Sequence, residues 1–131
     1  MKHLQLMTTL TLAFALIGTA HAADKAAKAK GKKLQHVVAF KFKAAATPEQ
    51  IQDMEKEFRA LKDKIPGIVA FEAGVNNSPE GKNHGFTNCY ILTFKNEKDR
   101  DAYLPHPAHK AFGKIVGPLL EDVFVLDFWT E

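Results

Sequence analysis

Four segments of the chain are rich in Val, Ile and Phe and are bounded by turn-forming residues, a pattern typical of β-strands. They span residues 36–43 (HVVAFKFK), 68–77 (IVAFEAGVNN), 86–95 (FTNCYILTFK) and 122–130 (DVFVLDFWT). Side chains point alternately to the two faces of a strand. We therefore expect His36, Val38, Phe40 and Phe42 to share one face of the first strand.

Between the first two strands, apolar residues recur at spacings of three and four, which predicts an amphipathic helix. These residues are Ile51, Met54, Phe58, Leu61 and Ile65. Thr47 is the expected N-cap, Pro48 occupies the first helical position, and Gln50 is placed to close a capping box. The helix should therefore begin sharply after Thr47.

A short helical segment over residues 99–104 follows the third strand, and a further helix begins at Pro107 after the interruption at Pro105. The order of elements is then β-α-β-β-α-β. This order predicts an α+β, ferredoxin-like fold with an antiparallel four-stranded sheet.

The last predicted strand is apolar on both faces. Phe124, Leu126 and Phe128 lie on one face, and Val123, Val125 and Trp129 lie on the other. Two helices can cover only one face of a four-stranded sheet, so the second face requires a partner. We therefore predict a homodimer in which two copies pack sheet against sheet.

The first 22 residues predict a secretory signal peptide that is cleaved after Ala22. Lys2 precedes an apolar run, and the run ends in the small-residue pattern Ala20-His21-Ala22. Polar residues interrupt this run, so a retained membrane anchor is the less favoured alternative. We expect a periplasmic or secreted protein with no stable membrane insertion after cleavage.

Positive charge is concentrated just before the domain. Residues 23–33 (ADKAAKAKGKK) predict a disordered Lys/Ala-rich linker, and residues 34–131 predict a single domain. Of the chain's 18 basic and 15 acidic residues, six basic and one acidic precede Leu34, which leaves 12 basic and 14 acidic residues in the domain. The domain has no cluster of Lys and Arg, so we expect no nucleic-acid binding. Cys89 is the only cysteine, which excludes an intrachain disulfide, and we expect it to be buried.

Several short motifs of the domain resemble the stress-responsive A/B barrel family. They are HVVAFKFK, IPGI, SPE, GFTN, YLPHPAH and DVFVLDF, and they occur in the order and spacing of that family over nearly all of residues 35–128. The resemblance implies a dimeric α+β barrel in which two ferredoxin-like sheets close on each other. This implication agrees with the two apolar faces of the last strand.

A plant cyclase of this family closes a polyketide chain by an aldol-type condensation, and its residues can be carried over onto this chain. The tyrosine and the histidine implicated in its catalysis correspond to Tyr103 and His109, and a histidine of its first strand corresponds to His36. A further histidine of the cyclase corresponds to Asn88, so this chain departs from the cyclase there. Asn88 retains the ability to orient a carbonyl group by hydrogen bonding.

Residues 103–112 (YLPHPAHKAF) contain the strongest candidates for a site. Pro105 and Pro107 turn the chain, so we expect Tyr103 and His109 to converge on one cavity. Such a pocket would be mostly apolar with a few polar groups, as small-ligand sites usually are. The expected ligand-binding residues are His36, Asn88, Tyr90 and His106.

The sequence is compatible with three functions. The first is binding of a small apolar or aromatic molecule. The second is an enzyme with cyclase, aldol-type or monooxygenase-like chemistry, in which His109 is the general base and Tyr103 donates a hydrogen bond to a developing enolate. The third is a structural, stress-protective dimer without a ligand, in which His106 caps a helix, His109 bonds to the backbone and Tyr103 belongs to the core.

A metal site is a further alternative, since His106 and His109 are three residues apart and His84 lies in a long loop. A specific zinc site needs three or four committed ligands, and the lone cysteine lies away from this group. The sequence also contains no haem-attachment motif. We therefore expect no metal and no cofactor.

Overall fold

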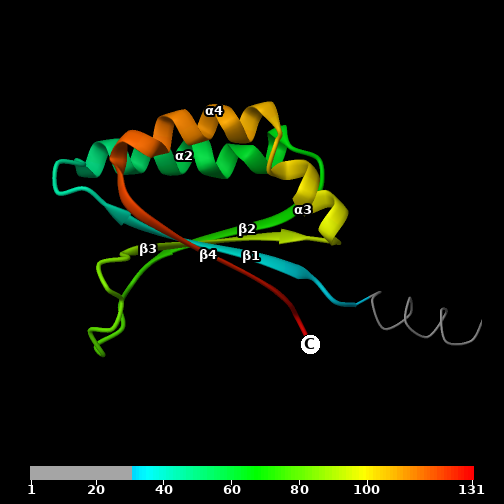
Figure 1. Cartoon of the computed structure of the whole chain (residues 1–131), viewed down its shortest axis with the longest axis horizontal. Helices are drawn as coiled ribbons and strands as arrows, with labels where there is room; N and C mark the ends of the chain where they lie inside the picture. Colours follow the sequence, from blue (N-terminus) through cyan, green and yellow to red (C-terminus); the bar gives the residue numbers. More distant parts are fainter. Residues whose placement is uncertain (1–30) are drawn as a thin grey trace, which may run out of the picture. The chain divides into compact units, whose positions relative to one another are not determined.

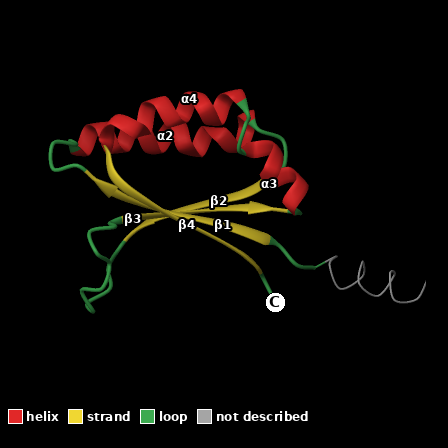
Figure 2. Cartoon of the chain, in the orientation of Figure 1, coloured by secondary structure: helices red, strands yellow, loops and turns green. Residues whose placement is uncertain are grey.

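The computed structural model describes residues 31–131, which form a four-stranded antiparallel sheet with helices on one face (Figure 1). The elements are β1 (Leu34–Phe42), α2 (Pro48–Lys64), β2 (Ile68–Val75), β3 (Asn88–Phe94), α3 (Glu97–Tyr103), α4 (Pro107–Val116), the 3-10 helix η1 (Gly117–Leu119) and β4 (Leu120–Trp129). This order confirms the predicted ferredoxin-like α+β fold (Figure 2). The predicted signal peptide and most of the predicted linker lie outside the described residues. None of the described helices has the length and apolar character that a membrane span requires.

The strand order in the sheet is β2-β3-β1-β4, so β1 is central and β2 and β4 form the edges. Each strand is antiparallel to its neighbours. His36 of β1 lies between Leu92 of β3 and Asp127 of β4, and Val38 lies between Tyr90 and Val125. Residues opposite each other share a face of the sheet, so Asp127 faces the same side as His36.

The start of α2 confirms the predicted capping box. The Gln50 backbone N–H donates to Thr47 Oγ1 at 3.2 Å, and the Thr47 N–H donates to Gln50 Oε1 at 2.9 Å. After α2 the chain turns at Gly67, whose φ is +103°. A Cβ atom at this position would lie 2.9 Å from the Cβ of Asp99, so both the backbone conformation and the close approach require glycine.

The core lies between the sheet and the helices α2 and α4. The predicted apolar stripe of α2 is confirmed, because Met54, Phe58 and Leu61 are fully buried. They pack with buried strand residues, including Tyr90 and Leu92. Both helices lie on the same side of the sheet, and the described residues leave the opposite face uncovered (Figure 1).

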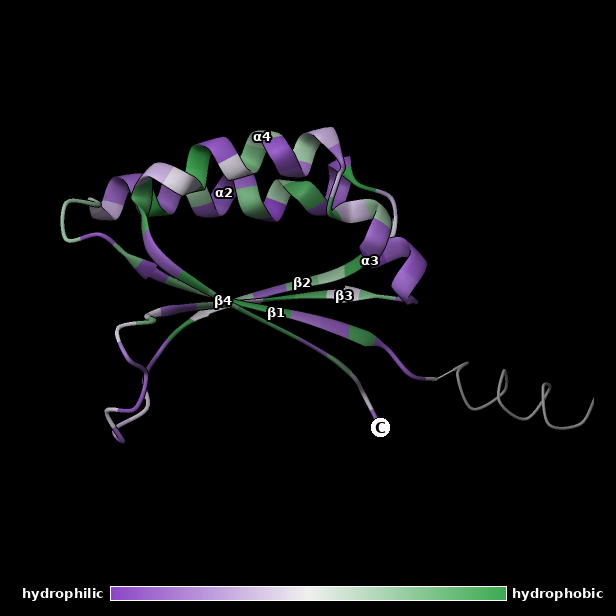
Figure 3. Cartoon of the chain, in the orientation of Figure 1, coloured by the Kyte–Doolittle hydropathy of each residue, from purple (hydrophilic) through white to green (hydrophobic). Residues whose placement is uncertain are grey.

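Strand β4 is hydrophobic and largely uncovered (Figure 3). On the face opposite the helices, Phe124, Leu126 and Phe128 are 49%, 51% and 47% exposed. Cys89 is also exposed, so the expectation that it is buried is wrong for the single chain. The reason is its register: Cys89 pairs with Ala39, which pairs with Phe124, and all three point to the uncovered face.

Candidate functional site

A cavity of about 340 Å³ lies between α4, the end of α3 and the helix-facing sides of β1 and β4. Its walls are mostly apolar and include Val38, Phe40, Phe58, Phe112, Val123 and Val125. Three polar side chains also line it, namely His36, Tyr103 and His109. The structure therefore brings three of the predicted site residues together in one cavity.

His36 enters the cavity from the central strand. It is only 5% exposed, and its ring nitrogen Nδ1 lies 2.7 Å from Asp127 Oδ1 on the neighbouring strand. An ionised carboxylate can only accept, so Nδ1 carries the hydrogen and the neutral ring keeps an acceptor at Nε2. The other carboxylate oxygen of Asp127, Oδ2, accepts a hydrogen bond from Arg100 Nη1.

Tyr103 and His109 lie side by side because the chain turns between them. α3 ends at Tyr103 and α4 begins at Pro107, so His109 sits in the first turn of a new helix. The ring centroids of Tyr103 and His109 are 4.2 Å apart, and those of His36 and Tyr103 are 5.7 Å apart. The predicted convergence of Tyr103 and His109 at the proline turn is therefore present.

The structure indicates which atoms of Tyr103 and His109 can donate a hydrogen bond and which can accept one. His109 Nδ1 donates to the backbone oxygen of Leu104 at 2.9 Å, which leaves Nε2 as the acceptor of the neutral ring. A tyrosine hydroxyl of ordinary pKa is already protonated at neutral pH, and burial raises the pKa of Tyr103 further above 10.0, so its hydroxyl can donate there.

The polar atoms at this end of the cavity are open to a ligand. Among the described residues, neither the Tyr103 hydroxyl nor His36 Nε2 has a hydrogen-bond partner. Every described side-chain nitrogen or oxygen that is sealed from solvent has such a partner. These two atoms are therefore not sealed from solvent, and the residues that carry them line the cavity.

Two other predicted ligand-binding residues, Asn88 and Tyr90, lie in a separate cluster. Glu55 Oε1 accepts hydrogen bonds from the Tyr90 hydroxyl at 2.7 Å and from Asn88 Nδ2 at 3.0 Å. Burial raises the pKa of Tyr90 most, and the hydrogen bond to Glu55 raises this pKa further. Neither residue is among those that line the cavity, and their ligand-binding role stays a prediction.

His106, the remaining predicted ligand-binding residue, caps α4. Its Nδ1 accepts a hydrogen bond from the Ala108 backbone N–H at 3.1 Å. A capping side chain satisfies one of the free N–H groups at a helix start, so this contact has a structural purpose. His106 does not line the cavity, and its ligand-binding role also stays a prediction.

Asp127, which contacts His36, and Arg100, which contacts Asp127, were not predicted from the sequence. A signal for Asp127 was present, because it is the only charged residue in the apolar run of residues 123–129 and shares a strand face with Val123 and Val125. Arg100 lies three residues before Tyr103 on α3. Only the sheet register and the placement of α3 bring Arg100 to Asp127.

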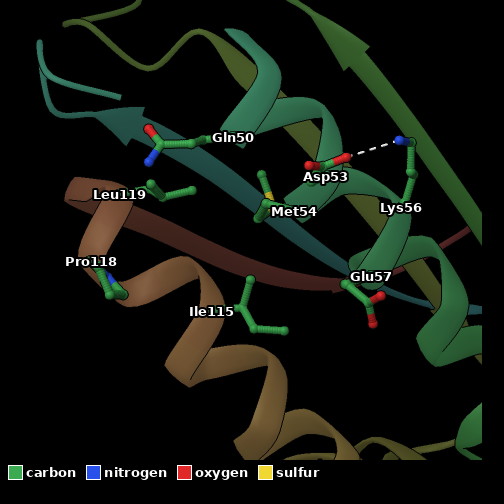
Figure 4. Close-up of a pocket in the computed structure, with 8 residues that line it drawn as sticks. All are labelled: Gln50, Asp53, Met54, Lys56, Glu57, Ile115, Pro118 and Leu119. Carbon is green, nitrogen blue, oxygen red and sulfur yellow. Dashed lines mark hydrogen bonds and ion pairs between the residues drawn. The ribbon is translucent and has the colours of Figure 1, made fainter. Parts of the chain in front are cut away.

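A surface groove of about 450 Å³ lies between α2 and α4, with Met54 and Ile115 in its walls and the ion pair of Asp53 and Lys56 at its rim (Figure 4). Its charged side chains are solvent-exposed, and we assign no function to it. Within residues 31–131, no three His, Cys, Asp or Glu side chains gather closely enough to hold a metal ion.

The chain is similar to proteins of one family over almost its whole domain. The family model for the stress responsive A/B barrel domain matches residues 34–130. The chain is 33% identical over 101 residues to the stress-response A/B barrel domain-containing protein HS1 of Arabidopsis thaliana, covering 77% of this chain and 92% of that protein. It is 26% identical over 95 residues to olivetolic acid cyclase of Cannabis sativa, covering 72% of this chain and 94% of the cyclase.

Solved structures share the same architecture. Hydroxynitrile lyase from Passiflora edulis has a TM-score of 0.71 at 24% identity, covering 76% of this chain and 94% of the lyase. A dimeric protein of unknown function with a ferredoxin-like fold, from Bacteroides fragilis, has a TM-score of 0.59 at 28% identity, covering 73% of this chain and 94% of that chain. The fold, the ordered motifs and the match over residues 34–130 together establish that this chain belongs to the stress-responsive A/B barrel domain family.

Proposed function

We propose that this protein binds a small, mostly apolar or aromatic molecule that carries a hydroxyl or carbonyl group. The observation behind the proposal is the convergence of Tyr103, His36 and His109 in an otherwise apolar cavity. Small-ligand sites commonly combine apolar walls with a few fixed polar groups. The cavity of about 340 Å³ is at the lower end of the range of ligand pockets, which favours a small ligand.

The protein is proposed to bind this ligand as a homodimer. The face of β4 that carries Phe124, Leu126 and Phe128 is about half exposed in the single chain. Burying such a face contributes on the order of ten kcal/mol before association costs, at about 25 cal/mol per Å² of apolar surface. The Bacteroides fragilis relative is described as dimeric, which supports the same arrangement here.

A second candidate function is acid–base catalysis on a carbonyl compound. The specific observation that favours it is the ring contact between Tyr103 and His109, in which His109 keeps a free Nε2 acceptor. Nε2 would take a proton from the carbon next to a carbonyl, and the Tyr103 hydroxyl would donate to the oxygen of the enolate. Olivetolic acid cyclase and hydroxynitrile lyase are enzymes on this fold, which supports the candidate by analogy.

Export is proposed from the sequence of residues 1–22, which lie outside the described residues. Mass spectrometry of the protein isolated from its own cells tests this step. A mature chain that begins at Ala23 in the cell envelope or the medium supports export, and an intact N-terminus in the cytoplasm contradicts it.

Native mass spectrometry of the same material also tests ligand binding, since a retained molecule adds a defined mass. Titration with benzoylacetone, an aromatic β-diketone whose enol form has both a hydroxyl and a carbonyl, provides a direct measurement. We expect Tyr103→Phe and His109→Ala to weaken binding and His84→Asn, in an exposed loop outside the cavity, to leave it unchanged. Wild-type protein that neither retains a molecule nor binds benzoylacetone contradicts the proposal.

Exchange of the α-hydrogens of phenylacetone in D₂O, followed by NMR, distinguishes the catalytic candidate. Exchange that is accelerated by the wild type and lost in His109→Ala, while binding persists, favours catalysis. Binding without accelerated exchange favours a carrier.

A further inference from the structure

Arg100 lies just outside the cavity, where the last turn of α3 approaches the edge strand β4. Its Nη1 donates to Asp127 Oδ2, and its Nε donates to Asp101 Oδ1 at 2.7 Å. Arg100 is not among the residues that line the cavity. Its guanidinium is directed at carboxylates of its own chain, so it is placed to orient a neighbour rather than to contact a ligand.

We propose that Arg100 is a positioning residue that holds the Asp127 carboxylate against His36 and thereby fixes His36 as the Nδ1–H tautomer. The cavity then offers a hydrogen-bond acceptor at His36 Nε2. This inference rests on the proposed ligand binding and deepens it, because it names a chemical requirement: the ligand must present a hydroxyl, such as a phenol or an enol, at this end of the cavity.

The two oxygens of Asp127 have separate partners, which is the geometric basis of the proposal. Oδ1 accepts from His36 Nδ1 at 2.7 Å, and Oδ2 accepts from Arg100. The side chains of Arg100 and Asp127 are 21% and 23% exposed, so the pair is mostly shielded from water. Hydrogen bonds between charged groups are shorter and stronger than neutral ones, which holds the carboxylate in one orientation.

Without Arg100, the only side-chain hydrogen bond left to the Asp127 carboxylate among the described residues is the one from His36 itself. Asp127 lies on an edge strand between the apolar residues Val125 and Trp129 of the same face. A carboxylate in apolar surroundings without a cationic partner either turns towards water or takes up a proton. A carboxylate that has turned away no longer accepts from His36 Nδ1, and a protonated carboxyl group can donate to Nδ1 instead. In either case the Nδ1–H tautomer of His36 is no longer favoured.

The same short helix supplies both Arg100 and Tyr103, which are three residues apart on α3. One side chain faces Asp127 and the other lines the cavity next to His36. The placement of α3 therefore sets the Tyr103 hydroxyl and the His36 acceptor together. A ligand with adjacent hydroxyl and carbonyl groups would match this pair, since Tyr103 donates and His36 accepts.

The test is the ring ¹⁵N NMR spectrum of His36 in the full chain labelled with ¹⁵N-histidine, recorded at about pH 8, where an ordinary histidine is neutral. We expect the wild type to show protonated Nδ1 and unprotonated Nε2. Arg100→Gln should shift the population towards the Nε2–H tautomer, which free histidine prefers in water, with at least a threefold fall in the ratio of Nδ1–H to Nε2–H. Arg100→Lys should lie between the two, because lysine keeps the charge but lacks the planar fork.

Lys98→Gln is the matched control, since it removes a positive charge from the exposed side of the same helix. It should leave the spectrum of His36 unchanged. Two results overturn the proposal: a wild-type His36 that is mainly the Nε2–H tautomer, or folded Arg100→Gln and Arg100→Lys proteins that keep the wild-type tautomer. The wild-type spectrum can overturn the proposal even where one variant fails to fold, and the other Arg100 variant then tests the role of Arg100.

Ligand titration separates this proposal from the proposed function. We expect Arg100→Gln to lower the affinity for benzoylacetone about fivefold to tenfold, the loss that corresponds to one neutral hydrogen bond. The affinity for butyrophenone, a ketone without a hydroxyl, should change much less. Equal losses for both compounds contradict the ligand requirement. If the tautomer of His36 depends on Arg100 but the protein binds neither compound, the positioning role is upheld and binding of these ligands is refuted. If the protein binds benzoylacetone but the tautomer does not depend on Arg100, only the positioning role of Arg100 is refuted.

Discussion

Phe58 of α2 stacks on Phe112 of α4, with ring centroids 4.3 Å apart and 17° between the ring planes. This contact joins the two helices above the sheet, and both rings also line the cavity.

Replacing Phe112 with Ala should lower the free energy of unfolding by about 3–5 kcal/mol, the usual cost of removing a buried aromatic ring. Urea denaturation measures this loss. Ile115→Ala on the same helix is the control: Ile115 is 44% exposed, so its loss should be much smaller, and equal losses would contradict the assignment of Phe112 to the core.

A charge on the uncovered face of β4 should dissociate the proposed dimer. Leu126 is 51% exposed in the single chain, and Leu126→Lys would place an ammonium group in the sheet-to-sheet interface, where a desolvated charge is costly. Light scattering at micromolar concentration should report dimer mass for the wild type and monomer mass for this variant. Ile115→Lys introduces the same charge on the helix side and should remain dimeric. A monomeric wild type would refute the dimer.

Gly113 should make α4 less stable than an alanine would, while leaving more space in the cavity. It lines the cavity, and a Cβ atom at this position would meet no atom within 4 Å. Gly113→Ala should raise the free energy of unfolding by about 0.5–1 kcal/mol, because alanine is the better helix former. The added methyl group narrows the cavity, so the affinity for benzoylacetone should fall. Lys114→Ala on the exposed side of α4 controls for changes in helix propensity. A stabilised Gly113→Ala protein with unchanged affinity would place the ligand elsewhere.

Buried tyrosines should make the fold sensitive to alkaline pH. Burial raises the pKa of Tyr103 above the ordinary value of 10.0, whereas the unfolded chain ionises near that value. The corresponding stability is fully present below pH 10 and is lost as the pH rises towards the folded-state pKa. Above about pH 10, the wild type should lose up to about 1.4 kcal/mol per pH unit more than Tyr103→Phe. Urea denaturation of both proteins between about pH 8 and 11 measures the difference, and parallel pH profiles would show that the Tyr103 hydroxyl titrates normally in the folded state.

Local patterns in the sequence predicted the elements of this fold well, because their causes are local. Thr47 and Gln50 lie one helical turn apart, and the apolar stripe of α2 needs only the spacing of its own residues. The unpartnered face of β4 was also visible, since Phe124, Leu126 and Phe128 alternate along one strand. Pro105 and Pro107 likewise indicated that Tyr103 and His109 would converge.

The partners of each polar group depended on contacts that no local pattern reveals. His36 and Asp127 are 91 residues apart in the chain, and only the register of β1 against β4 places them opposite each other. Asn88 points to the same side of the sheet as His36, but it pairs with Phe40, further along β1, and there it meets Glu55 of α2. Sharing a face was predictable from alternation, whereas the position along the strand was not.

Alternate residues of β4 serve two different surfaces. Val123 and Val125 line the cavity, whereas Phe124 and Leu126 between and beside them lie on the face proposed to bind a second copy. A ligand that binds the dimer more tightly than the monomer must strengthen dimerisation by the same factor for each ligand bound, because the two equilibria are thermodynamically linked. The affinity for the ligand would then rise with protein concentration over the range in which the dimer forms, so that occupancy of the cavity would report on the abundance of the protein itself.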